Sequence, residues 1–155
     1  MSGDYKLKTV DAIINHEQTV KFENEQDRLT ESGAPSEPIW AYHSWNTEKT
    51  HYLLKDNLHP RYAKVARYGP GVYFHEMAFT NPYDPEGMLV CQILPGKSLE
   101  SRDDHPNKNK KYPGDTSNVP DGFHSKQVFQ GIGIYSYVIP RPEQILPRFI
   151  LRLQE

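Results

Sequence analysis

Cysteine is nearly absent from this chain, which has one, Cys91, among 155 residues. One cysteine cannot form an internal disulfide, and no cysteine pair or His-Glu-x-x-His segment is present to bind zinc. Cys91 lies in the apolar run Met88–Leu94, so we expect a buried and unreactive thiol. These absences exclude a disulfide-stabilised scaffold and predict no metal site. They also agree with a reducing intracellular compartment, cytoplasmic or nuclear.

Basic residues are not in excess either. The chain has 18 Lys and Arg against 20 Asp and Glu, and its formal net charge is −2. A dedicated nucleic-acid-binding domain usually carries a basic excess, so this class is disfavoured. No apolar run approaches the length of a membrane span, and Met1–Lys6 lacks the apolar core of a signal peptide. We therefore expect no membrane partner.

Proline and aromatic residues are well represented. Thirteen prolines and a mean hydropathy of −0.77 are typical of a solvated, loop-rich fold. Aromatic residues make up 12% of the chain and several apolar runs are intact, which argues against disorder. A length of 155 residues is enough for one sizeable core, so we expect a single domain over residues 1–155.

Apolar spacing and turn signals predict many strands with helices at the margins. The expected strands are Lys6–Asn15, Ile39–His43, Val72–Phe74, Gly87–Leu94, His124–Gln130, Ile132–Ile139 and Ile145–Leu153. The expected helices are His16–Glu31, Asn46–Asn57 and Glu76–Asn81. Between the strands, Ser98–Gly122 is expected to be a long polar loop. This order of elements predicts an α+β fold with a split sheet.

The most informative segment is Tyr68–Phe74, with the sequence YGPGVYF, and its continuation to Tyr83. Two glycines flank a proline, so the backbone bends there and carries few side-chain atoms. Tyr73 and Tyr83 stand at the two ends of the turn that follows, and rings so placed can close on a flat heteroaromatic ligand by offset stacking. The alternative for this segment alone is a turn feeding a core strand, with both tyrosines as packing residues.

Five segments of the chain follow the order of a known signature. Tyr68–Tyr83 resembles the G-x-G-[IV]-Y-F-A…S-x-x-Y signature of the poly(ADP-ribose) polymerase-like, diphtheria-toxin-type ADP-ribosyltransferases. The segments similar to other strands of that family are Thr9–Asn15, Trp40–Trp45, Met88–Lys97 and Tyr135–Ile150. The resemblance covers nearly the whole chain. It implies an α+β fold with a split antiparallel β-sheet core and a few peripheral helices.

The same resemblance implies a binding site for NAD as co-substrate. By position, the His43 imidazole would bind a ribose hydroxyl, and the backbone of Ser44 would hold the nicotinamide amide. Tyr73 and Tyr83 would enclose the nicotinamide ring, with a cation–π contribution of about 0.5–2 kcal/mol. Thr80 stands at the position of a serine that binds nicotinamide in the family, and its hydroxyl can serve the same role.

The binding set implied by the resemblance also includes Gly71 and Trp45. Gly71 leaves room for a ligand beside the backbone. Trp45 stands where the family has a small hydroxyl residue, and Ser44 stands where the family has glycine. The Cβ atom of Ser44 would narrow the nicotinamide pocket, so these two departures bear on nicotinamide affinity rather than on the fold.

The largest departure is at the third catalytic position, which follows His43 and Tyr73. Polymer-forming members of the family carry a glutamate there, whereas this chain has Ser136. The segment Gly131–Arg141 contains no carboxylate, so the conclusion does not depend on the alignment register. Serine is not a base at pH 7, and loss of a positioned general base costs about 10²–10⁴ in rate. We therefore expect transfer of one ADP-ribose with release of nicotinamide, and no polymer.

Two functions stay open on the sequence. The first is an intracellular NAD-dependent mono-ADP-ribosyltransferase. Its acceptor would be a protein, with a nucleic acid as the alternative. The alternative is a catalytically silent module of the same fold that binds NAD, ADP-ribose or a protein partner. The order of His43, Tyr73 and Tyr83 favours the enzyme, whereas the three departures just described favour the silent module.

Overall fold

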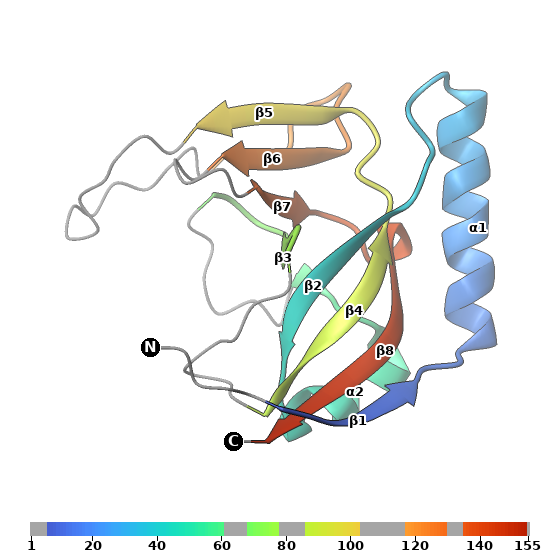
Figure 1. The fold of residues 1–155 in the computed structure, drawn as a ribbon. Helices are drawn as coiled ribbons and strands as arrows, with labels where there is room; N and C mark the ends of the chain where they lie inside the picture. The colour runs from blue at the N-terminus through green and yellow to red at the C-terminus, as the bar shows by residue number, and fades with distance from the viewer. Residues whose placement is uncertain (1–5, 61–67, 78–85, 103–116, 130–134, 155) are drawn as a thin grey trace.

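Within the described residues, which are 6–60, 68–77, 86–102, 117–129 and 135–154, this computed structural model has eight strands in one sheet of order β1-β8-β4-β2-β3-β7-β6-β5 (Figure 1). The strands are β1 (Lys6–Ala12), β2 (Ile39–Trp45), β3 (Val72–His75), β4 (Gly87–Ile93), β5 (Ser98–Arg102), β6 (Ser125–Phe129), β7 (Tyr135–Ile139) and β8 (Ile145–Gln154). The other elements are α1 (His16–Glu31), α2 (Thr47–Asp56) and the 3₁₀ turn η2 (Pro142–Gln144). The predicted α+β fold is confirmed.

β4 lies inside the sheet because its side chains are buried on both faces. Leu89, Cys91 and Ile93 are fully buried in the main core, and Met88 is buried on the opposite face. Its antiparallel neighbours are β2 on one side and β8 on the other. The predicted burial of Cys91 is confirmed, and burial raises the pKa of its thiol well above the usual range, which disfavours the reactive thiolate.

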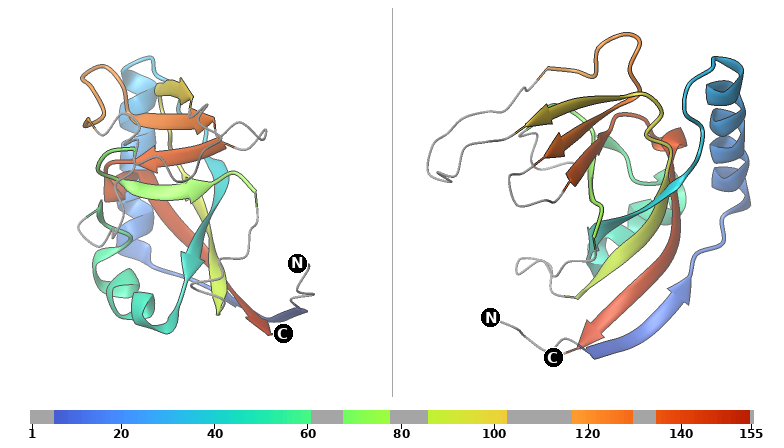
Figure 2. Two further views of the ribbon diagram at one scale, coloured as in Figure 1. Left: turned by 90° about the vertical axis from the view of Figure 1, so that its left-hand side faces the viewer. Right: turned by 45° about the horizontal axis from the view of Figure 1, so that its top comes forward.

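The sheet consists of two halves that are turned relative to each other (Figure 2). One half is β1, β8, β4 and β2, and the other is β3, β7, β6 and β5. Among the described residues the halves meet at one register pair, Tyr42 of β2 with His75 of β3. The split predicted from the sequence is therefore present. The sheet is mixed rather than purely antiparallel, because β5 and β6 run parallel.

One apolar core joins the two halves. Phe74 of β3 and Ile139 of β7 belong to the same buried cluster as Leu89 of β4 and Ile150 of β8. Complete burial of a large apolar side chain contributes about 1.5–3 kcal/mol, which exceeds the net contribution of about 0.5–1.5 kcal/mol from one hydrogen bond. Side-chain packing therefore holds the halves together where the hydrogen-bonded ladder is short.

Helix α1 lies beside β8 in Figure 1 and has the bounds predicted from the sequence. The Asn15 side chain caps its first turn by accepting from a backbone N–H at 3.1 Å. Phe22 and Leu29 lie on one face of the helix and pack against Leu94 and Leu146. The match follows because capping and apolar periodicity are both local signals.

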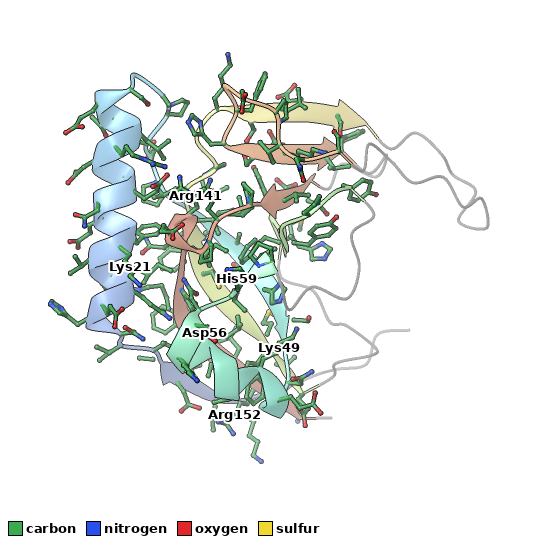
Figure 3. The ribbon with its side chains drawn as sticks, turned by 180° about the vertical axis from the view of Figure 1, so that it is seen from behind. Lys21, Lys49, Asp56, His59, Arg141 and Arg152 are labelled. Carbon is green, nitrogen blue, oxygen red and sulfur yellow. The ribbon has the colours of Figure 1, made fainter. Side chains whose placement is uncertain are left out.

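Helix α2 lies across the β2–β4–β8 part of the sheet when the molecule is seen from behind (Figure 3). Its Leu53 belongs to the main core. Asn46 caps the helix, and its Oδ1 accepts from the backbone N–H of Lys49 at 3.0 Å. This cap matters for the candidate site because it fixes where Lys49 stands relative to the end of β2.

Two predicted elements differ from the structure. β5 occupies the start of the predicted loop Ser98–Gly122 and pairs with β6. Its one apolar residue, Leu99, gives no alternating pattern, so only the pairing partner defines it as a strand. Residues 76–77 form a bend rather than the start of the predicted helix Glu76–Asn81, and residues 78–81 lie outside the described residues.

No described helix covers the outer face of the β1–β8–β4–β2 half (Figure 1). Apolar side chains form a strip on this face. Trp40 is 48% exposed, and its ring stacks on Phe149 with the centroids 6.4 Å apart. Leu7 and Val10 continue the strip onto the edge strand β1 and are 54% and 52% exposed.

Candidate functional site

The candidate site is the split where β2 and β3 separate. Continuing their register would set Ser44 opposite Tyr73. Instead, the carbonyl oxygens of both residues accept from side chains. His43 Nδ1 donates to Tyr73 O at 2.7 Å, and Lys49 Nζ donates to Ser44 O at 2.7 Å. The His43 and Lys49 side chains thus supply the donors that backbone N–H groups would supply if the β2–β3 ladder continued.

The His43 imidazole is fixed in this split. A carbonyl oxygen can only accept, so Nδ1 carries a proton toward Tyr73 O, and in the neutral imidazole Nε2 then keeps its lone pair. The ring also meets the Phe74 ring, with the centroids 5.5 Å apart. Strand alternation places Phe74 and Tyr73 on opposite faces of β3. His43 therefore contacts Tyr73 through its backbone carbonyl.

The ammonium group of Lys49 lies in front of His43 Nε2. It donates to Ser44 O and to Ser44 Oγ, both at 2.7 Å, and lies 3.5 Å from His43 Nε2. An ammonium has three N–H donors, so it can donate to more than one of these acceptors at once. Lys49 comes from the part of α2 that adjoins β2 (Figure 3). Bonds from a charged donor at this length are roughly twice as strong as neutral ones, so Lys49 is firmly held.

Tyr73 contacts the Gly-Pro-Gly turn that precedes its own strand. Its hydroxyl donates to Gly69 O at 2.6 Å and accepts from Tyr68 N at 2.8 Å. Its ring stacks on the Tyr68 ring, with the centroids 6.2 Å apart. Burial raises the pKa of the Tyr73 phenol, and the hydrogen bond from Tyr68 N opposes this shift. The hydroxyl of Tyr73 is therefore engaged with the chain itself.

The glycines of the turn are required by close packing of the chain. Gly69 has a φ of +97°, and a Cβ atom there would collide with Ser117 O. A Cβ atom at Gly71 would lie 2.5 Å from Val138 Cγ1 of β7. Neighbouring segments of the same chain thus fill the space beside both glycines.

Ser136 is buried in β7. It pairs with His75 of β3 and Val128 of β6, and 4% of its surface is exposed. Burial lowers the pKa of the His75 imidazole, so the neutral form of this neighbour is favoured. No carboxylate is present among residues Tyr135–Ile139 of β7. The third predicted catalytic position is therefore uncharged and enclosed.

The remaining predicted residues are placed differently. The Trp45 side chain lies in the main core and is 3% exposed, with the Arg152 guanidinium 5.0 Å from its ring centroid. Its indole N–H is buried with no hydrogen-bond partner among the described residues. Thr80 and Tyr83 lie outside the described residues, and their roles stay predictions.

The described residues do not fit NAD in the way that the resemblance implies. The Ser44 carbonyl, expected to hold the nicotinamide amide, already accepts from Lys49. The same ammonium stands before His43 Nε2, which was expected to bind a ribose hydroxyl. The structure thus brings His43, Ser44 and the Tyr73 backbone together, but around a cation of the protein.

Sequence reasoning missed two lysines. Lys49 carries no motif, although its place three residues after the helix cap Asn46 is a signal that it turns back toward the strand end. Lys126 is 1% exposed, and its Nζ donates to Tyr68 O at 3.0 Å and to Ser117 O at 2.6 Å. Its neighbours in β6 are Ser125 and Gln127, and this polar run gave no sign of a buried contact.

In the part of the chain that the structure describes, no group of three or more His, Cys, Asp or Glu side chains is placed to hold a metal ion. Over the same residues, no helix is long and apolar enough to cross a membrane.

Comparison with known proteins bears on the fold. No family model and no curated protein matches the chain. Among 258 matching chains of solved structures is one described as the crystal structure of the TASOR pseudo-PARP domain. It matches with a TM-score of 0.72 and 13% sequence identity, over 96% of this chain and 83% of that one. At this identity the likeness shows the fold, which is the poly(ADP-ribose) polymerase-like α+β fold.

Proposed function

We propose that this domain is a catalytically silent module of the ADP-ribosyltransferase fold, which works by binding a partner. The observation that carries the proposal is the uncharged third position. Ser136 is buried beside His75, and β7 has no carboxylate. The likeness in fold to a domain described as a pseudo-PARP supports the same conclusion.

The chemistry explains why this position matters. Cleaving nicotinamide from ribose develops positive charge on the sugar, and a fixed negative group nearby stabilises that charge. A buried serine hydroxyl supplies no charge, and the neighbouring imidazole is held toward its neutral form. A serine is also no general base, and the lack of a positioned general base costs about 10²–10⁴ in rate. Binding is what such a fold retains.

A protein is the partner class we propose. The formal net charge of −2 opposes a polyanion such as nucleic acid. In the apolar strip, Trp40, Leu7 and Val10 are exposed and Phe149 is half-buried beneath the Trp40 ring. Exposed apolar patches on small domains commonly contact other proteins. An intracellular setting, in the cytoplasm or the nucleus, is part of the proposal and is supported by the unpaired thiol of Cys91.

The second candidate is the mono-ADP-ribosyltransferase with NAD as co-substrate. One observation favours it. The bond from His43 Nδ1 to Tyr73 O selects the tautomer of the neutral ring whose Nε2 accepts a hydroxyl hydrogen. The acceptor of the ADP-ribose would be a protein, with a nucleic acid as the alternative.

Radiolabelled NAD separates the two functions. The purified chain is incubated with NAD labelled in the ADP-ribose part, with and without candidate protein and nucleic-acid acceptors. We expect no label on any acceptor, no polymer ladder, and no nicotinamide release above the rate without protein. Single additions of ADP-ribose would instead establish the transferase. A ladder would show that an acid outside β7, such as Asp121 or Glu143, reaches the site.

A further inference from the structure

The split between β2 and β3 ends in a cluster of three hydrogen-bond acceptors. They are the carbonyl and the hydroxyl oxygens of Ser44 and the Nε2 atom of His43. Nε2 is an acceptor because Nδ1 donates to Tyr73 O. An organic ligand whose single polar atom replaces the ammonium at two or more of these acceptors needs a nitrogen with at least two N–H bonds. Primary carboxamides and primary amines meet this requirement.

We infer that Lys49 is a built-in occupant of this acceptor cluster, and that its ammonium closes the domain to ligands carrying a primary carboxamide, nicotinamide and NAD included. This inference rests on the proposed function, because it gives the physical reason why the domain would leave NAD unbound. It differs from the missing carboxylate, which affects catalysis and leaves binding untouched.

The position of Lys49 follows from local structure. The Trp45 side chain is buried in the core and fixes the end of β2. Asn46 then caps α2 through the backbone N–H of Lys49. The ammonium is thus tethered five residues from the Ser44 atoms that it contacts. A tether this short gives the ammonium a high effective concentration at the cluster.

Charge also favours Lys49 over an external carboxamide. Its bonds to the two Ser44 oxygens are both 2.7 Å long and come from a cation. A carboxamide is neutral, so its bonds to the same oxygens are roughly half as strong. A free carboxamide must also lose its translational freedom on binding, whereas Lys49 is already in place.

The test is nicotinamide binding to the variant Lys49→Ala. Alanine keeps the backbone N–H that Asn46 uses, so the cap and the helix remain. By isothermal calorimetry, we expect Lys49→Ala to bind nicotinamide about tenfold or more tightly than the parent chain. The matched control is Lys55→Ala, since Lys55 is an exposed lysine of the same helix. It should bind nicotinamide as weakly as the parent.

The outcomes separate this inference from the proposed function. If Lys49→Ala binds nicotinamide no more tightly than the parent, and the parent shows no transferase activity, the inference about Lys49 is wrong. The proposed function as a silent module is then unaffected. Transfer of label from NAD by the parent overturns both. Methylammonium is added as a second probe. If it binds Lys49→Ala and nicotinamide does not, the cluster selects cations and the carboxamide assignment is overturned.

A measurement on the parent chain needs no variant. Amines are acetylated with a limiting reagent, and the labelled lysines are quantified by mass spectrometry. A held ammonium reacts slowly, so we expect Lys49 to be labelled about tenfold or more slowly than the exposed Lys55. Equal rates would show that the ammonium of Lys49 is not held at Ser44 and would overturn the inference.

Discussion

At the scale of single residues, Asn57 shows how one side chain can join distant segments. It follows α2 with a φ of 63°, a positive value that no other non-glycine residue has among those described. Its Nδ2 donates to Pro142 O at 3.0 Å and to Ile145 O at 2.9 Å, and its Oδ1 accepts from Leu58 N at 2.7 Å. These bonds maintain a backbone conformation that would otherwise be unfavourable.

Replacing Asn57 tests whether its hydrogen bonds offset the unfavourable backbone conformation. Asn57→Ala loses the three bonds and keeps the unfavourable φ, so we expect it to lower the free energy of unfolding by about 2–4 kcal/mol. Asn57→Gly loses the same bonds but tolerates a positive φ, so its loss should be about 1 kcal/mol smaller. Urea denaturation of the three proteins measures both differences. A glycine variant less stable than the alanine variant would contradict the strain argument.

At the scale of elements, the sequence predicted best the elements that depend on local signals. Helix α1 has an asparagine cap and an apolar face, both visible in the sequence, and its predicted bounds are those observed. β4 is apolar on both faces, which predicted its interior place. β5 was missed because Ser98–Arg102 is mostly polar. It is a strand only because β6 lies beside it, and pairing across the long intervening segment has no local signal.

Lys126 also makes contacts between distant segments that have no local signal in the sequence. Its buried ammonium donates to Tyr68 O of the Gly-Pro-Gly turn and to Ser117 O. Met has nearly the same length without the donors, so Lys126→Met leaves both carbonyls without this partner while the stem still fills its space. We expect a loss of about 1–3 kcal/mol in unfolding free energy.

The control for that measurement is Lys8→Met, on the exposed strand β1. Its thermal unfolding should match that of the parent within about 0.5 kcal/mol, the range of ordinary surface substitutions. Hydrogen exchange at the Tyr68 amide should also become faster in Lys126→Met alone. If the two variants were equally stable, water or another donor would have to satisfy these carbonyls.

At the scale of the whole molecule, the fold could be predicted and the state of the site could not. The motif order was sufficient for the α+β fold and for the neighbourhood of His43, Ser44 and Tyr73. The place of the Lys49 ammonium at Ser44 could not be predicted from the sequence, because the direction of this side chain depends on how α2 packs across the sheet. The close packing at Gly71 could not be seen from the sequence either. Its close neighbour is Val138, about 67 positions away by the numbering of the chain.

The two halves of the sheet raise a final question at this scale, which is whether they unfold together. They share one register pair among the described residues, but Phe74 lies in the core that spans both and is 0% exposed. Phe74→Ala should lower the free energy of unfolding by about 3–5 kcal/mol. Because the core is shared, native-state hydrogen exchange should become faster in β4 and β8 by the same factor as in β7. Faster exchange confined to β3 and β7 would show instead that the halves are separate cooperative units.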